Sequence, residues 1–87
     1  MATIILSHDV KDVSVWKPIY VADAPRRAKA GLVELAVGTK SDNPNKVFMV
    51  WKGDPLAVDK MLHDPDLAEV MKAAGVVSAP ELTVINS

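Results

Sequence analysis

The chain has 87 residues, with ten basic and eleven acidic side chains and a formal charge of −1. This length allows one domain, residues 1–87, and the lack of cysteine excludes disulfide scaffolds, zinc ribbons and thiol catalysts. The charges are spread along the chain and no apolar run approaches the ~20 residues of a membrane span, so we expect a cytoplasmic protein with neither a nucleic-acid nor a membrane partner.

The first third of the chain predicts a strand followed by an interrupted helix. Residues 2–8 are short, β-branched and apolar, as in a buried strand. Apolar residues then recur at helical spacing after a cap at Asp12 or Ser14. At Pro25 we predict a kink or a break, because proline lacks the amide that an interior helical position donates. Gly31 is expected to end this helical region.

Residues 32–39 and 46–52 are the next predicted strands, and they form a hairpin. The segment between them reads SDNPN, and its Asp, Asn and Pro are typical of turns. We therefore expect a loop over residues 41–45, longer than the tightest hairpin turns.

An Asp-Pro pair, typical of a helix cap followed by proline at the first helical position, occurs twice in the last part of the chain. The two pairs predict short helices over residues 55–62 and 65–74, separated at His63. Gly75 is expected to close the second helix, and residues 81–86 form the last predicted strand.

The order of these elements is β-α-β-β-α-β, which is the ferredoxin-like plan. The predicted fold class is therefore α+β, with a four-stranded antiparallel sheet and helices on one face. Right-handed crossovers are expected to place the strands at residues 2–8 and 46–52 side by side in the sheet centre, and we expect these two strands to be parallel.

The predicted strands are apolar on both faces, although the helices can cover only one. By strict alternation Ile4 and Ile5 lie on opposite faces, and Val33, Leu35 and Val37 share one face. A sheet with one face in water usually alternates apolar and polar residues, and a large exposed apolar patch usually marks an interface. We therefore predict an obligate homodimer in which a second copy covers the open face of the sheet.

Four segments carry a resemblance to a known superfamily: VSVWKPIY, PRRAKAGLVEL, DNPNKVFMVWKGD and DPDLAEVMKAAGVVSAPEL. The chain resembles the dimeric α/β barrels, which include antibiotic-biosynthesis-monooxygenase-like domains, and is most similar to small members without an assigned reaction. The resemblance implies two sheets packed into one barrel, with a small ligand between helices and sheet in several members. It implies no single activity, because the superfamily includes cofactor-free oxygenases, haem degraders and cyclase-like enzymes.

No cofactor and no metal are expected. Haem degraders of this superfamily are similar in using a histidine in a stretch like DPDLAEVMK, where this chain has Met71. The dipeptides His8-Asp9 and His63-Asp64 suggest a metal, but adjacent residues on a strand point to opposite sides, which argues against chelation of one ion by each pair.

The first predicted helix carries four candidate ligand-binding residues. Trp16, Tyr20, Asp23 and Arg27 are spaced four, three and four residues apart, which places them in one stripe of the helix. Two alternatives follow. Either Pro25 turns Asp23 and Arg27 outward as a surface pair, or the stripe lines a pocket in which the aromatic rings stack on a ligand and Arg27 holds an anion or enolate.

The two histidines are candidate catalytic residues together with Arg27. His8 ends the first strand and Trp51 ends the third, so we expect them to lie close together at one edge of the sheet. A neutral imidazole there can act as general base on an acidic C–H or a phenol; the alternative is a solvated histidine bonded to Asp9 or to the helix start. His63 is expected to be a surface residue, and the alternative is that it acts as the general base in place of His8.

These features support two hypotheses of function. The first is a site between the first helix and the sheet that binds a small aromatic or carbonyl-bearing molecule and supports cofactor-independent monooxygenase-like or cyclase-like chemistry, with Trp51 as a further wall. It requires a cavity of ~300 Å3 or more that contains a histidine and Arg27. The alternative is a non-catalytic ligand-binding or structural dimerisation domain.

Overall fold

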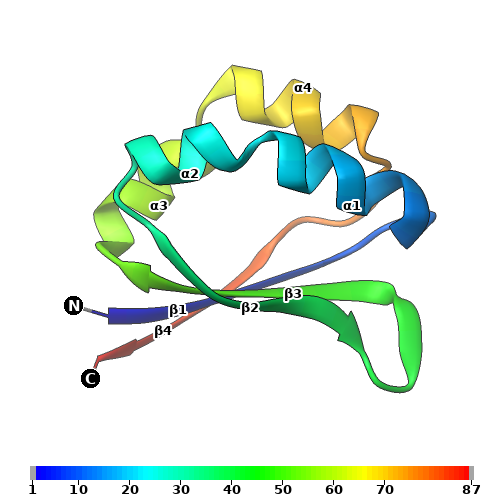
Figure 1. Ribbon diagram of the computed structural model, residues 1–87, viewed down its shortest axis with the longest axis horizontal. Helices are drawn as coiled ribbons and strands as arrows, with labels where there is room; N and C mark the ends of the chain where they lie inside the picture. Colours follow the sequence, from blue (N-terminus) through cyan, green and yellow to red (C-terminus); the bar gives the residue numbers. More distant parts are fainter. Residues whose placement is uncertain (1, 87) are drawn as a thin grey trace.

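The computed structural model describes residues 2–86, so the two terminal residues of the expected 1–87 domain lie outside the described residues. Figure 1 shows a sheet beneath a single layer of helices. The elements are β1 (Ala2–Asp9), α1 (Val13–Ala22), α2 (Ala24–Lys29), β2 (Val33–Lys40), β3 (Asn43–Gly53), α3 (Pro55–Leu62), α4 (Pro65–Ala73) and β4 (Glu81–Asn86). The predicted α+β class, with helices on one face of the sheet, is confirmed. None of the helices within residues 2–86 has the length and apolar character needed to cross a membrane.

The four strands lie in the order β2-β3-β1-β4, and every neighbouring pair is antiparallel. The ferredoxin-like plan and the central position of β1 and β3 are confirmed, but the expectation that these two strands are parallel is wrong. The hairpin is the reason. The helical crossover makes β1 and β2 point the same way, and β3 turns back from β2, so β3 runs against β1.

Side-chain caps begin three of the four helices. The carboxylates of Asp12, Asp54 and Asp64 each accept a hydrogen bond from the backbone N–H two residues further on. Both predicted Asp-Pro helix starts are therefore confirmed, and Asp12 rather than Ser14 caps the first helix.

The predicted break near Pro25 is also confirmed. Helix α1 ends at Asp23, and Pro25 lies in the first turn of α2, where its missing amide is tolerated. Gly31 and Gly75 follow α2 and α4 with φ angles of +76° and +79°, a left-handed conformation that favours glycine.

The β2–β3 hairpin turns more tightly than predicted. The pairing of the strands extends to Lys40 and Asn43, which leaves only Ser41 and Asp42 in the turn. The expected loop over residues 41–45 is therefore wrong from Asn43 onward, because residues 43–45 belong to β3. Thr39 pairs with Val47 and Lys40 pairs with Asn43, so the residues between these two partners bulge out of β3.

A bulge in β2 changes the side on which its residues lie. Leu35 is an extra residue between Glu34 and Ala36, whose partners on β3 are consecutive. Strict alternation, which predicted Val33 and Val37 on one face, therefore fails. Val37 turns toward the helices and packs against the core.

The core lies between the helices and the side of β1 and β3 that faces them. Ile4 and Val47 on the two central strands and Val58 on α3 are fully shielded from solvent, and Trp51 is 2% exposed. Because these residues come from both layers, burying them holds the helices on the sheet.

The opposite face of the sheet is open and partly apolar. Strand pairing places Val33 and Ile85 on this face together with Ile5 and Val50. The side chains of Val33 and Ile85 are 56% and 47% exposed, respectively. The helices of one chain therefore leave this surface uncovered, as the sequence predicted.

We predict that I4A lowers the free energy of unfolding by about 2–5 kcal/mol, because it removes a fully buried side chain from the core and leaves a cavity. Urea denaturation at one fixed protein concentration measures this loss. The control is L56A, since the Leu56 side chain is 70% exposed and its truncation should change stability by no more than about 0.5 kcal/mol. Equal losses in the two variants would contradict the assignment of Ile4 to the core.

Candidate functional site

A cavity of about 50 Å3 lies between the helix layer and the sheet. Its lining comes from all four helices and from β1 and β3, and most of it is apolar. Six of the seven predicted site residues line this cavity: His8, Trp16, Tyr20, Asp23, Arg27 and Trp51. Met49, Met61 and Met71 supply much of the remaining wall.

His8 is the most unusual residue of the cavity because it is buried without a polar partner at one ring nitrogen. Only 4% of its surface is exposed, and its Nδ1 has no hydrogen-bond partner among residues 2–86. The Trp16 ring packs edge-on against it, with 5.9 Å between ring centroids. Burial lowers the pKa of His8. The backbone of His8 and the negative charge of Asp9 raise this pKa, but their effect is smaller, so the imidazole is neutral at pH 7.

The expected proximity of His8 and Trp51 at one strand end is wrong. In the antiparallel pairing of β1 and β3, His8 lies opposite Val47, whereas Trp51 lies opposite Ile4. The two residues still line the same cavity. The alternative of a solvated His8 is also excluded by its burial.

Tyr20 connects α1 to the two neighbouring strands. Its hydroxyl donates a hydrogen bond to Glu34 Oε1 on β2, at 2.7 Å, and accepts one from Trp51 Nε1 on β3, at 3.1 Å. Its ring stacks on Trp16, with 4.8 Å between centroids and 21° between planes. Trp16 and Tyr20 thus stack on each other, whereas the sequence suggested that both would stack on a ligand.

Burial of Tyr20 and its hydrogen bond to Glu34 raise its pKa to about 12. Burial is the largest cause and the hydrogen bond to Glu34 the next, while Trp51 and the positive charge of Arg27 act in the opposite direction. Tyr20 is therefore a neutral phenol at every physiological pH.

Asp23 forms an ion pair, but not with the residue expected from the sequence. The Nε of Arg26 lies 3.1 Å from Asp23 Oδ2, and the Nη1 of the same side chain lies 2.9 Å from Asp64 Oδ2. Arg26 therefore ties the junction of α1 and α2 to the start of α4. The surface pair of Asp23 with Arg27 is not formed, because the break at Asp23 changes the helical phase.

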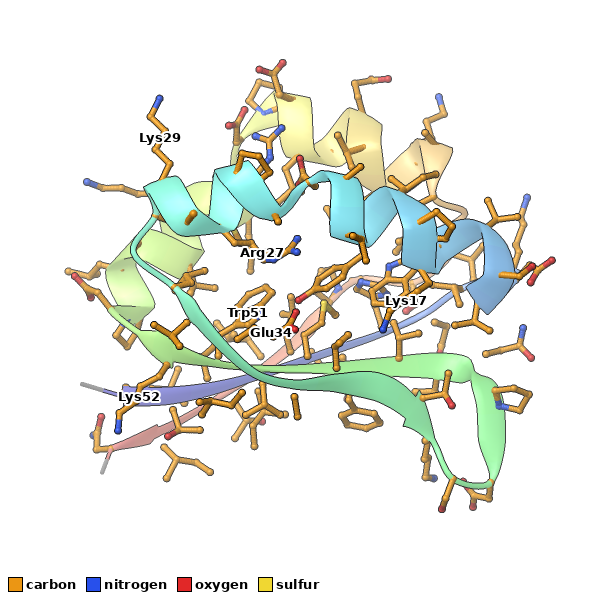
Figure 2. The ribbon with its side chains drawn as sticks, in the orientation of Figure 1. Lys17, Arg27, Lys29, Glu34, Trp51 and Lys52 are labelled. Carbon is orange, nitrogen blue, oxygen red and sulfur yellow. The ribbon has the colours of Figure 1, made fainter. Side chains whose placement is uncertain are left out.

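Arg27 points inward from α2 instead. Its guanidinium carbon lies 3.7 Å from the centroid of the Tyr20 ring, a cation–π contact. Figure 2 shows Arg27 between α2 and the sheet, on the same side as Trp51 and Glu34. Arg27 therefore faces the pocket, as the second of the two alternatives predicted. In this structure it contacts Tyr20 and not a ligand.

A second, larger hollow adjoins the cavity. This outer groove has a volume of about 360 Å3, and Tyr20, Arg27 and Trp51 line both spaces. Its other lining residues are Lys17, Val21, Ala24, Ala28, Leu32, Glu34 and Val37. One space of ~300 Å3 with both a histidine and Arg27 was expected; the structure divides it into a small cavity with His8 and a large groove without histidine.

His63 lies outside both spaces. It ends α3, its side chain is 77% exposed, and its Nδ1 lies 2.8 Å from the carbonyl oxygen of Asp59. It is a surface residue in this structure and does not face the candidate site. Among residues 2–86, no three His, Asp or Glu side chains gather as they would around a metal ion.

Glu34 is the site residue that the sequence interpretation missed. It is the one charged side chain within the apolar run LVELAV, and it pairs across the sheet with Trp51. A single carboxylate within an apolar run is the signal that could have drawn attention to Glu34, although the sequence alone does not identify its partner.

The chain has one tyrosine, so its ionisation can be followed directly at 295 nm. At pH 11 we expect folded protein to keep Tyr20 protonated, because its pKa is about 12, whereas unfolded chain with a pKa near 10.0 is ionised. Stability therefore falls as the pH rises from 10 through 12. E34Q should lower the folded pKa, and identical absorbance of folded and unfolded protein at pH 11 would contradict the buried network.

Comparison with known proteins gives the fold. The sequence matches no known family and no curated protein. Among solved structures, a candidate antibiotic biosynthesis monooxygenase from Bordetella bronchiseptica has a TM-score of 0.76 at 15% identity, with 99% of this chain and 95% of that chain covered. SnoaB, a cofactor-independent oxygenase from Streptomyces nogalater, has a TM-score of 0.69 at 19% identity, covering 99% and 93%.

An uncharacterised NIPSNAP domain protein from Burkholderia xenovorans is also similar, with a TM-score of 0.70, 12% identity, and 100% and 94% of the two chains covered. At these identities the likeness extends to the backbone and not to individual side chains. The chain therefore shares the ferredoxin-like fold of antibiotic-biosynthesis-monooxygenase-like proteins.

Proposed function

We propose that the protein binds a small aromatic or carbonyl-bearing molecule between α1 and the sheet and removes a proton from it, with His8 as general base. The observation that carries this proposal is the buried, neutral His8 whose Nδ1 has no partner among residues 2–86, in a mostly apolar cavity. An unpartnered polar atom in such a place is costly for stability, and a ligand that supplies a donor offsets that cost.

The surroundings of His8 suit proton abstraction from a weak carbon acid. The lowered pKa keeps the imidazole unprotonated, and the apolar wall excludes the water that would compete for it. Loss of a proton next to a carbonyl leaves an enolate, and Arg27 is the cation that lines the same cavity. SnoaB, which shares this fold, is a cofactor-independent oxygenase, so the fold is compatible with chemistry that needs no cofactor.

The ligand must displace side chains to reach His8. The cavity of about 50 Å3 is smaller than the ~150 Å3 apolar cavity that holds a benzene ring. Three methionines line it, and methionine side chains adapt their shape to what they contact. We therefore expect the methionines and the Trp16–Tyr20 stack to move when a ring enters.

A second candidate function is binding without catalysis. The outer groove is large enough for an organic molecule, and it contains Arg27 but no histidine. In that case the ligand stays on the outer side of Tyr20, and His8 takes no part.

Hydrogen–deuterium exchange at the C1 methylene of 2-tetralone, followed by proton NMR in D2O, tests the first candidate. We expect the protein to accelerate exchange and H8Q to reduce the catalysed rate by about 100-fold or more. The lowered pKa predicts that the rate persists below pH 6.5 and falls only when His8 itself becomes protonated.

The matched control for this experiment is H63Q, which removes the exposed histidine and should leave the catalysed rate unchanged. Equal rates in H8Q and the wild-type protein would exclude His8 as the base. Exchange no faster than in buffer, with both variants folded, would favour the non-catalytic candidate.

We propose further that two copies pair through their open sheet faces to form an α/β barrel. Support comes from the exposed Val33 and Ile85, which lie with Ile5 and Val50 on the face that the helices leave uncovered. At ~25 cal/mol per Å2, a few hundred Å2 of apolar surface buried per chain contributes several kcal/mol before the costs of association. A cytoplasmic location, expected from the sequence, stays a prediction.

Light scattering at low micromolar concentration should return twice the chain mass of 9.4 kDa. V33D places a charge in the proposed interface and should return the mass of one chain. L56D adds the same charge on α3, where Leu56 is 70% exposed on the helix side, and should remain dimeric. A wild-type mass of one chain would exclude the barrel.

A further inference from the structure

The outer groove has the size and shape of a binding site for an organic molecule. Helices α1 and α2 form one side of it and strands β2 and β3 the other. Its volume of about 360 Å3 exceeds the ~150 Å3 that holds one benzene ring. Most of its wall is apolar, from Val21, Ala24, Ala28, Leu32 and Val37, so the body of a ligand in it is apolar as well.

The charged side chains that line the groove favour a ligand with a negative charge. Two cations line it, Lys17 from α1 and Arg27 from α2, and within residues 2–86 neither has an acidic group within 4.0 Å. The one carboxylate that lines the groove belongs to Glu34, and it accepts a hydrogen bond from the hydroxyl of Tyr20. The groove therefore carries a net positive charge, with its cations available to an anion.

Arg27 is held in a position suited to a carboxylate. Its guanidinium carbon lies over the Tyr20 ring, 3.7 Å from the centroid. Stacking of this kind uses the face of the group and leaves its N–H edge for a carboxylate in the same plane. Figure 2 shows Arg27 directed into the space between the layers, while Lys29 of the same helix extends away from it.

We propose that the outer groove binds an aromatic carboxylate. The carboxylate pairs with the N–H edge of Arg27 and is attracted by Lys17, and the ring lies along the apolar wall. This site does not need His8, which lines the inner cavity and not the groove. The proposal therefore stands or falls separately from proton abstraction.

NMR titration of the 15N-labelled full chain with 2-naphthoate tests the site. We expect shifts of the Arg27 Nε–H and Trp51 indole N–H signals, because both side chains line the groove. The neutral isostere 2-naphthamide should bind about tenfold more weakly or worse, since it lacks the charge that Arg27 pairs with. Affinity for 2-naphthoate should fall as salt is added, whereas that for the amide should not.

Variants separate the groove from general surface charge. R27Q should weaken 2-naphthoate binding about tenfold or more, R27K and K17Q should weaken it less, and K29Q, which removes a charge from α2 outside the groove, should leave it unchanged. H8Q should bind as the wild-type protein does. Equal affinity for the amide and the carboxylate, or equal losses in K17Q and K29Q, would overturn the proposal even if R27Q does not fold.

Discussion

The hydroxyl of Tyr20 is the contact on which the arrangement of the site depends. It accepts a hydrogen bond from Trp51 on β3 and donates one to Glu34 on β2, so one atom of α1 is fixed to two strands. The same side chain stacks on Trp16 on one side and on the guanidinium of Arg27 on the other. Because all of these groups meet at one ring, Tyr20 fixes α1 against β2 and β3 at this point, and it lines both the inner cavity and the outer groove.

The two spaces differ in their chemistry. The inner cavity is nearly apolar, so a histidine in it loses solvation and its pKa falls. The outer groove opens beside Lys17 and Arg27, where an anion finds partners, and the carboxylate of Glu34 is occupied by the phenol of Tyr20. The inner cavity thus contains a neutral base, the outer groove is lined by two cations, and Tyr20 and Arg27 line both spaces.

Local signals in the sequence were enough to predict the elements and the plan of the fold. The Asp-Pro pairs placed α3 and α4 within one residue of their observed bounds, and all four residues of the stripe from Trp16 to Arg27 line the cavity. The direction of β3 follows from the predicted order, because a hairpin reverses β3 relative to β2, so the expected parallel pairing was an error of inference. The bulge at Leu35 and the ion pairing of Arg26 depend on contacts between elements, which spacing and propensity along the chain do not contain.

The double ion pair of Arg26 has a consequence for how the site responds to salt. Helix α2 is only six residues long, it carries Arg27, and two carboxylates hold its neighbour Arg26, one at the α1 junction and one at the first turn of α4. Both pairs are partly exposed, so dissolved ions weaken them. Ionic strength therefore acts twice on this protein: added salt screens the attraction between an anion and the cations of the outer groove, and it also weakens the two ion pairs that hold the helix carrying Arg27.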